Sequence, residues 1–400
     1  MKRHDATAVR QGRQTASAPA VPALLRRMNE RRLIEAVQTD GPISRAALVR
    51  RTGISPPTVS KLVESLIQAS LLEEIEPLSG STGRPAKLLR LAGESVRIVA
   101  AVVDIQQCSL AATGLDGTLH EDRVVRFRTP GDYVKLLDAL VEHTQRLTSA
   151  DKTTTLAVGL CIPGLIDRRR QRVLLSANLH LLDGRLPAAD LQRRLNLPVV
   201  LLHETDVLCL GQRAFGPARG LDDLVLIDAA GGLGMAVMID GQLLAGYRGL
   251  AGELGHVTVE PRGRPCGCGN IGCLETVASD ATLAELVSQR LGQTIDIDRV
   301  VEMARRGELQ ADAELNQTLD YLAIGVAGTV NLFNPAAVLI HSRMFDVRDD
   351  AFERLRTTVA RRALTPSLAE CKILRASGGK LESAVAATIS HLTSVLGPKV

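Results

Sequence analysis

The segment from Gly249 to Glu275 constrains the chain most, because it gathers cysteine, histidine and glutamate in fewer than thirty residues. Cys266, Cys268 and Cys273 form a C-x-C-x4-C run separated only by glycine, asparagine and isoleucine, and His256 precedes this run by ten residues. Thiolates on a glycine-rich backbone can surround one ion, and three cysteines with one histidine make a tetrahedral zinc site. The spacing therefore predicts a closed, structural Zn2+ site, since four protein ligands leave no position for a catalytic water.

Two other interpretations of these cysteines are open. They could be incidental in a loop of small residues, although free cysteines are usually scattered and buried singly. They could also form disulfides, but the chain starts without a signal peptide or a long apolar span. In a reducing cytoplasm, clustered cysteines bind metal more often than they pair. We therefore expect a cytoplasmic protein that contains zinc and has no membrane contact.

Length and composition leave the partners open. A chain of 400 residues is too long for one ordinary core and suggests two or three domains. A hydrophobic content of 45% is ample for burial, while 2% aromatic residues and no tryptophan mean that aliphatic side chains fill the cores. The formal net charge of +4 permits nucleic-acid binding without establishing it, because a localised basic face decides that property.

The amino-terminal quarter has the pattern of a DNA-reading domain. Residues 1–22 form a basic tail without apolar periodicity, and helical spacing of apolar residues then runs from Ala23 to a stop at Asp40. We expect Ser44 to cap a second helix and Ser55, which two prolines follow, to cap a third. Helix, helix, glycine turn and helix is a helix-turn-helix arrangement, although any three-helix bundle shares its periodicity.

In that arrangement, the first part of the third helix enters the major groove of DNA. The side chains that we expect to contact bases and phosphates are Ser55, Thr58, Ser60 and Lys61. Two short apolar segments, 71–75 and 86–91, bracket a polar tip and predict a winged hairpin. Arg84 in this tip precedes a proline, which holds it extended and suits it to the minor groove. A plain linker is the alternative for this tip.

From Ser95 onward the pattern alternates between strands and helices. The first set of strands is expected at 96–103, 108–113, 119–127 and 155–162, with a helix at 132–147. A second set is expected at 224–227, 235–240 and 337–340, with helices at 282–291, 300–306, 314–333 and 380–396. This order resembles the ribonuclease-H-like lobes of sugar kinases. The predicted fold class is α/β, with a winged helix-turn-helix at 23–91, one lobe at 92–215 plus 380–400, and another at 216–379.

Several motifs resemble those of the ROK family, which comprises repressors, open reading frames and kinases, and the whole chain resembles its repressor branch. Gly-Glu-Leu-Gly-His at 252–256 and Cys-Gly-Cys-Gly-Asn-Ile-Gly-Cys-Leu-Glu at 266–275 match the zinc and sugar signature of the family. The turn Thr-Gly-Ile-Ser and the wing Thr-Gly-Arg-Pro match its regulators. The resemblance implies an actin-like, two-lobed ROK domain with a sugar between the lobes. It assigns the sugar contacts to Asn178, Asp206, Glu253, His256 and Glu275, and such convergent polar groups suit hydroxyl-bearing ligands.

The resemblance also raises an alternative function, an ATP-dependent sugar kinase that carries a DNA-binding domain. The kinases of the family have Asp-x-Gly-Gly-Thr where this chain has Asp104-Ile105-Gln106-Gln107-Cys108, and glycines where it has His341-Ser342-Arg343. Losing these glycines removes the backbone cradle for phosphates, on which phosphoryl transfer depends. Asp206 is then a vestigial kinase-base position, and we expect no catalytic residue.

We therefore predict a sugar-responsive transcriptional regulator, a repressor of genes for carbohydrate uptake or catabolism. Its expected partners are operator DNA, a sugar or sugar derivative, and further copies of itself in a homodimer or homotetramer. A sugar that prefers one closure of the two lobes would shift the population of the DNA-competent form. A regulator that has lost small-molecule binding and responds to a protein partner is a further alternative.

Overall fold

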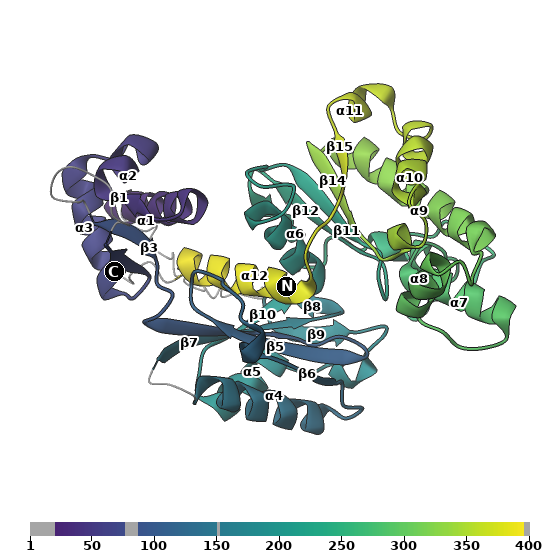
Figure 1. Ribbon diagram of the computed structural model, residues 1–400, viewed down its shortest axis with the longest axis horizontal. Helices are drawn as coiled ribbons and strands as arrows, with labels where there is room; N and C mark the ends of the chain where they lie inside the picture. The colour runs from purple at the N-terminus through teal and green to yellow at the C-terminus, as the bar shows by residue number, and fades with distance from the viewer. Residues whose placement is uncertain (1–20, 77–86, 150–152, 396–400) are drawn as a thin grey trace, which may run out of the picture. The chain divides into compact units, whose positions relative to one another are not determined.

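The computed structural model describes residues 21–76, 87–149 and 153–395 (Figure 1). The chain divides into two compact units, one of residues Met1–Leu91 with Thr393–Val400 and the other of residues Ala92–Leu392. The tail expected at 1–22 lies outside the described residues, apart from its last two. No helix in the described ranges combines the length and apolarity that a membrane crossing requires.

The first unit is a winged helix-turn-helix domain. Its helices are α1 (Val21–Asp40), α2 (Arg45–Thr52) and α3 (Pro56–Gln68). Its strands are β1 (Ile43–Ser44), β2 (Leu72–Ile75) and β3 (Leu88–Leu91), which pair antiparallel in the order β1-β3-β2. The two strands of the wing and the three helices were expected from the sequence, whereas the short strand β1 was not.

Local hydrogen bonds fix the turn between α2 and α3. The Ser44 hydroxyl accepts a hydrogen bond from the Ala47 N–H at 3.2 Å, and Gly53 ends α2 with a φ of 68°, a region that favours glycine. Ser55 is the N-cap residue of α3, as expected, but its hydroxyl bonds the Thr58 hydroxyl at 2.8 Å instead of a backbone N–H.

Two five-stranded sheets of the same plan form the second unit. Each has three consecutive antiparallel strands followed by two strands that join in parallel. The first sheet has the order β10-β7-β4-β5-β6, from β4 (Val96–Val102), β5 (Gln107–Thr113), β6 (Val124–Arg128), β7 (Thr154–Ile162) and β10 (Val199–His203). The second has the order β13-β12-β11-β14-β15, from β11 (Leu224–Asp228), β12 (Gly234–Ile239), β13 (Gln242–Leu243), β14 (Ala337–His341) and β15 (Lys372–Arg375). We call the parts built on these sheets the first and second lobes.

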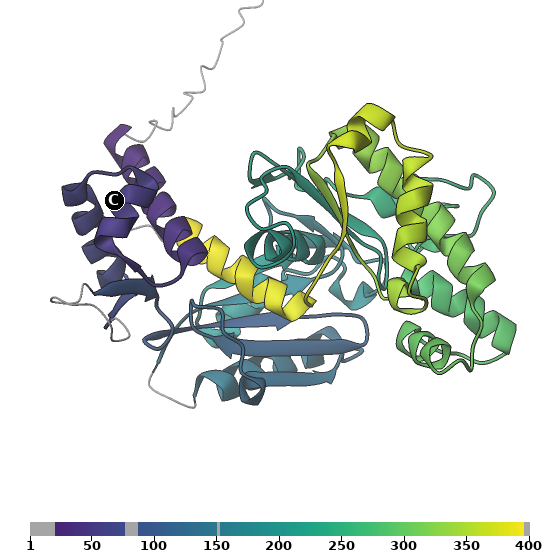
Figure 2. The same cartoon turned by 45° about the horizontal axis from the view of Figure 1, so that its top comes forward.

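Helices cover both faces of the first sheet. Helices α4 (Tyr133–Thr148) and α5 (Pro187–Leu195) lie on one face, and α12 (Lys380–Val395) crosses the other (Figures 1 and 2). A Cβ added to Gly159 of β7 would come within 1.8 Å of the Thr388 hydroxyl, so glycine lets α12 lie directly against the sheet. Burial on both faces explains why β4 is apolar throughout from Ile98 to Val102.

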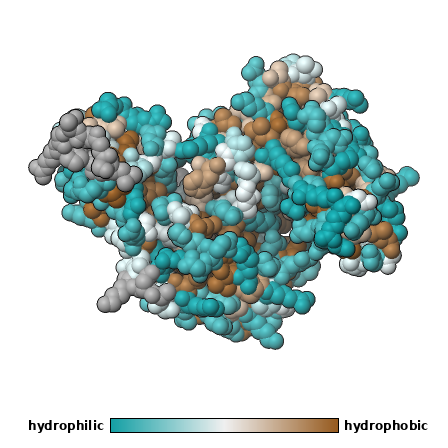
Figure 3. All heavy atoms as spheres, in the orientation of Figure 1, coloured by the Kyte–Doolittle hydropathy of each residue, from teal (hydrophilic) through white to brown (hydrophobic). Residues whose placement is uncertain are grey.

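The remaining elements complete the second unit. They are the hairpin of β8 (Leu165–Asp167) and β9 (Arg172–Leu175), with helices α6 (Glu204–Ala214), α7 (Asp280–Leu291), α8 (Ile297–Arg305), α9 (Asp312–Phe333), α10 (Ala351–Ala360) and α11 (Thr365–Ala369). On the face shown in Figure 3, hydrophilic residues predominate and hydrophobic residues form separate small groups, as on ordinary globular surfaces.

One strand of the second unit begins later than the sequence predicts. The strand expected at 119–127 begins only at Val124, because residues Glu121–Arg123 form a 3₁₀ turn and the Thr113 hydroxyl bonds the Thr118 carbonyl instead. In α9, Gly325 packs closely, since an added Cβ would lie 2.6 Å from Leu274, whereas Gly328 has open space around it.

Candidate functional site

A pocket in the second unit lies where the central strands of both sheets end. Asp104 follows β4 and Asp228 ends β11, and both line this pocket. Ligands of open α/β sheets bind at these carboxyl ends, where loops from several strands meet. The pocket is open to solvent at its mouth, and residues of both sheets' strand ends and loops line it.

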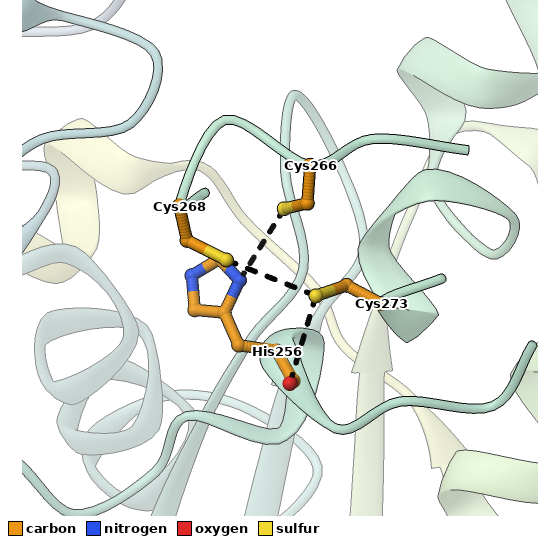
Figure 4. Close-up of side chains that lie close together, drawn as sticks. All are labelled: His256, Cys266, Cys268 and Cys273. Carbon is orange, nitrogen blue, oxygen red and sulfur yellow. Dashed lines mark hydrogen bonds between the residues drawn. The ribbon is translucent and has the colours of Figure 1, made fainter. Parts of the chain in front are cut away.

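The cysteine cluster stands beside one end of the pocket. The side chains of His256, Cys266, Cys268 and Cys273 point toward one another (Figure 4), and their ligand atoms all lie within 4.8 Å of one another. The sulfurs of Cys268 and Cys273 are 3.8 Å apart, which equals roughly the spacing of two thiolates on one tetrahedral zinc ion. The donor set and its geometry therefore fit a four-coordinate metal ion.

The backbone of this loop requires glycine. Gly272 has a φ of 71°, and an added Cβ would lie 1.6 Å from the carbonyl oxygen of Glu260. The Cys266 N–H donates to the Asn270 carbonyl at 2.8 Å and closes the loop between the first two thiols and the third. The chain at Gly272 lies directly against the chain at Glu260, because only glycine fits there. This close approach turns the sulfurs of the loop inward.

His256 and Glu275 connect the cluster with the pocket. The Nδ1 atom of His256 lies 3.6 Å from the Cys266 sulfur, and its Nε2 lies 3.9 Å from a carboxylate oxygen of Glu253. Glu275 places one oxygen 3.8 Å from the same sulfur and accepts a hydrogen bond from the Leu233 N–H with the other, at 2.9 Å. Burial raises the pKa of Glu253, against the opposing effect of nearby histidines. A bound metal would thus fix two side chains that face the pocket.

Asn178 reaches this end of the pocket from the first lobe. An added Cβ at Gly232 would lie 2.5 Å from Glu275 Oε2 and 3.2 Å from Asn178 Nδ2. Gly232 therefore marks the place where the two side chains converge, and its missing side chain leaves them room. Four of the five residues expected at a sugar, Asn178, Glu253, His256 and Glu275, line the pocket.

Asp206, the fifth, has a different environment. It stands in the first turn of α6, is not among the residues that line the pocket, and forms an ion pair with Arg168. Arg168 belongs to the turn between β8 and β9, a hairpin that the sequence analysis did not anticipate. The carboxylate is therefore held by a cation of the chain itself.

Lys380 dominates the other end of the pocket. Its ammonium group donates to Asp104 at 2.8 Å and to Glu204 at 2.7 Å, and lies 3.9 Å from Asp228. Burial lowers the pKa of Lys380, but the three carboxylates outweigh it and hold this pKa well above its ordinary value. The sequence analysis missed Lys380. A signal was present, because a lysine opening a helix opposes the helix dipole and needs an acidic partner.

The segment that replaces the second glycine cluster has its own hydrogen bonds. His341 bonds Asp228 at 2.8 Å, and the Ser342 hydroxyl donates to Asp280 at 2.6 Å. Burial raises the pKa of Asp228 and lowers that of His341, yet their attraction, with that of Lys380 for Asp228, leaves the pKa of Asp228 below and that of His341 above the ordinary value. Burial also raises the pKa of Asp280 to about 6. The side chains of His341, Ser342 and Asp280 are therefore hydrogen-bonded to other groups of the second lobe.

The residues expected at DNA lie at the start of α3. Ser55 and Lys61 are exposed, and Thr58 and Ser60 are half-buried, while Val59, Leu62, Val63 and Leu66 face the core of the first unit. Arg84, expected in the wing, lies outside the described residues. The described part of α3 thus presents a polar face that includes one lysine.

Comparisons with known proteins cover both units. Residues 103–391 match the ROK family, and residues 28–73 match the family described as winged helix-turn-helix DNA-binding. The xylose repressor of Bacillus subtilis (strain 168) is 28% identical over 343 residues, which make up 84% of this chain and 88% of that protein.

Solved structures agree with these matches. A ROK family transcriptional regulator, described as a homolog of the Escherichia coli Mlc protein, superposes with a TM-score of 0.78 at 25% identity, over 92% of this chain and 97% of its own. A ROK family glucokinase from Streptomyces griseus, solved with glucose and AMPPNP, has a TM-score of 0.66 at 24% identity, over 73% of this chain and 98% of its own. The glucokinase shows a likeness of fold alone.

Proposed function

Because the chain belongs to the ROK family and carries a winged helix-turn-helix domain, we propose that it is a sugar-responsive transcriptional repressor of genes for carbohydrate uptake or catabolism. One observation carries this proposal: side chains from both lobes converge on one pocket in a chain that also has a DNA-reading helix. The name of the Bacillus relative, a xylose repressor, points the same way.

The sugar lies, in this proposal, at the end of the pocket next to the cysteine cluster. Asn178 offers an amide from the first lobe, Glu253 and Glu275 offer acceptor oxygens from the second, and His256 with Nδ1 on a metal offers its Nε2–H as a donor. Ionised acceptors make strong hydrogen bonds to hydroxyl groups. A ligand that bonds both lobes stabilises one closure, and DNA affinity changes if the DNA-competent form closes differently.

Zinc is the metal that best suits the cluster, because three thiolates and one imidazole are its usual structural ligands. The ion would be held by His256 Nδ1 and the sulfurs of Cys266, Cys268 and Cys273, and would supply rigidity. With Nδ1 committed, Nε2 of His256 faces the pocket beside Glu253. The metal therefore acts on sugar binding through the position of this ring.

Asp206 takes part once its ion pair with Arg168 opens. The guanidinium and a sugar hydroxyl compete for the same carboxylate, so a sugar that reaches Asp206 displaces Arg168. This exchange costs little, because Arg168 is 37% exposed and returns to water, while the sugar hydroxyl replaces its hydrogen bond to Asp206. It links the β8–β9 hairpin to the occupancy of the pocket.

Sugar phosphorylation is disfavoured by three features of the pocket. Asp104 is bonded to Lys380, and Asp206, the vestigial base position, is paired with Arg168. The side chain of Ile105 lies within 3.3 Å of the position that a Cβ of Gly231 would take, in the space between the two strand ends. Phosphoryl transfer depends on groups that position phosphates. Here the two carboxylates are paired with cations of the chain, and the side chain of Ile105 fills the space near Gly231. A coupled ATPase assay with a panel of hexoses is expected to show no turnover, and robust turnover would establish the kinase instead.

Operator DNA is contacted by Ser55, Thr58, Ser60 and Lys61 of α3 and by Arg84 of the wing. A homodimer or homotetramer supplies two such helices to one operator, since single modules bind DNA weakly. The operator can be selected from random DNA with the purified protein. Lys61→Ala with Arg84→Ala is expected to abolish binding while zinc content and sugar binding stay unchanged.

The decisive test of sugar sensing is thermal unfolding with a panel of pentoses, hexoses and amino sugars. A ligand of the folded state raises the melting temperature. Glu253→Gln is expected to weaken the effective sugar at least tenfold, in line with the roughly 1.5 to 3 kcal/mol of a hydrogen bond to a charged group. The matched control is Glu353→Gln, an exposed position in α10. A panel without any shift in the wild-type protein would exclude sugar sensing and favour a protein partner as effector.

A further inference from the structure

The charge of the pocket restricts the chemistry of its ligand. Five carboxylates line it, from Asp104, Glu204, Asp228, Glu253 and Glu275, against a single ammonium group, that of Lys380. A divalent ion in the cysteine cluster would not reverse this balance, because three thiolates leave the site with a net charge of −1. A dianionic phosphate entering this pocket meets like charge on most sides.

Lys380 cannot compensate, because the chain already uses it. Its ammonium group has three carboxylates around it, at 2.7, 2.8 and 3.9 Å, and its side chain is only 16% exposed. A phosphate would have to displace Asp104 or Glu204 from this ammonium group, and it would then lie beside the displaced carboxylate, which carries like charge.

Three backbone N–H groups that could donate to a phosphate already donate to carboxylates of the chain. The Leu233 N–H of the glycine-rich turn donates to Glu275, and the Ala230 N–H of the same turn donates to Asp228. At the start of α12, the Gly379 N–H donates to Glu382 at 3.1 Å. Helix starts and glycine turns are the usual anion sites of α/β proteins, and here carboxylates of the chain accept hydrogen bonds from these three donors.

Two arginine side chains, Arg168 of the β8–β9 turn and Arg248, also have carboxylate partners in the chain. Arg168 is paired with Asp206, and Arg248 donates to Asp167 at 2.9 Å, where it holds the pKa of that carboxyl below its ordinary value. The ammonium group of Lys380 and both of these guanidinium groups are thus matched by carboxylates of the chain. We propose that the pocket selects an unphosphorylated sugar and rejects sugar phosphates and nucleotides. This inference rests on the proposed function, and it names the chemical class of the effector.

The test compares matched pairs on the full-length, metal-loaded protein by isothermal titration calorimetry. The probes are glucose with glucose 6-phosphate, N-acetylglucosamine with its 6-phosphate, and xylose with xylose 1-phosphate. At least one parent sugar is expected to bind, and its phosphate ester to bind at least tenfold more weakly. An ester that binds as tightly as its parent overturns this inference and leaves sugar sensing intact. Absence of binding by every probe overturns sugar sensing itself, and the inference with it.

A pair of variants tests the part played by Lys380. Asp104→Asn combined with Glu204→Gln releases the ammonium group, so the phosphate ester of the effective sugar is expected to gain at least tenfold in affinity while the parent sugar changes less than threefold. Glu204→Gln alone, a milder change for a protein that tolerates the pair poorly, is expected to give a smaller gain. The matched control is Glu142→Gln, exposed on α4. A folded variant that gains no ester binding contradicts the assignment of Lys380.

Discussion

The two ends of the pocket use the same acidic side chains in opposite ways. At the end next to the cysteine cluster, a carboxylate oxygen of Glu253 lies 3.9 Å from His256 Nε2, beyond hydrogen-bonding distance. At the other end, Asp104 and Glu204 are bonded to Lys380 at 2.8 Å or less. A carboxylate without a cation can accept bonds from hydroxyl groups of a ligand, whereas one bonded to an ammonium group cannot without losing that bond.

This contrast shows that a count of acidic residues does not define a ligand site. What matters is whether the chain itself supplies the counter-charge. A metal in the cysteine cluster would position one end and leave its carboxylates available, whereas Lys380 neutralises the carboxylates of the other end. The predictions below test this division, from the largest expected effect to the smallest.

Loss of the metal should have the largest effect. Cys273→Ser replaces a fully buried thiol of the cluster, and structural zinc can contribute about 10 kcal/mol where folding depends on it. We expect loss of stoichiometric zinc, a lower melting temperature and no response to sugar. Metal analysis and thermal unfolding measure this. Cys371→Ser, a buried cysteine outside the cluster, should retain the metal, and a variant at Cys273 with full sugar affinity would separate the cluster from the pocket.

Removal of Lys380 should come next. Lys380→Met leaves three carboxylates facing one another and is expected to cost about 3 to 5 kcal/mol at pH 7, measured by urea unfolding. Without the cation, the pKa values of these carboxyls rise in the folded state. A raised pKa gives stability that is present at low pH and lost as pH rises, so the deficit should shrink from pH 7 to pH 5. Lys372→Met, exposed on β15, is the control. A deficit that is constant with pH would contradict the buried charge cluster.

A smaller change should affect the end next to the cysteine cluster alone. Gly232→Ala introduces a Cβ that would lie 2.5 Å from Glu275 and 3.2 Å from Asn178, and separates them. We expect sugar affinity to fall at least tenfold with little loss of stability. Gly231→Ala is the matched control, because its Cβ meets only the flexible end of Ile105, at 3.3 Å. Equal effects of the two variants in calorimetry would show that convergence at Gly232 is unimportant.

Release of Asp206 should have the smallest effect. Arg168→Gln removes the partner of this carboxylate, and the guanidinium, which is 37% exposed and therefore screened by water, contributes about 1 kcal/mol or less. Sugar affinity is therefore expected to rise by up to about fivefold, since the sugar no longer competes with the guanidinium. Arg169→Gln, which changes an arginine stacked on Tyr247, is the control. Unchanged affinity would remove Asp206 from the sugar site.

The sequence by itself determined the features that depend on short spacings. The C-x-C-x4-C run predicted a cluster that could hold a metal, because residues this close share one loop whatever surrounds them. Apolar periodicity and the Ser44 cap predicted the helix-turn-helix for the same reason. Alternating strands and helices indicated two lobes, although they missed the β8–β9 hairpin, whose short strands carry little periodicity.

Only the tertiary structure decided how the pocket distributes its charges. Lys380 meets Asp104 across 276 positions of the sequence, and Arg168 meets Asp206 through a hairpin turn and a helix start. No local pattern records such pairs, because the ends of strands from distant segments come together only after both sheets have formed. The sequence thus named most of the residues that face the ligand, and the fold showed which of their charges are already neutralised.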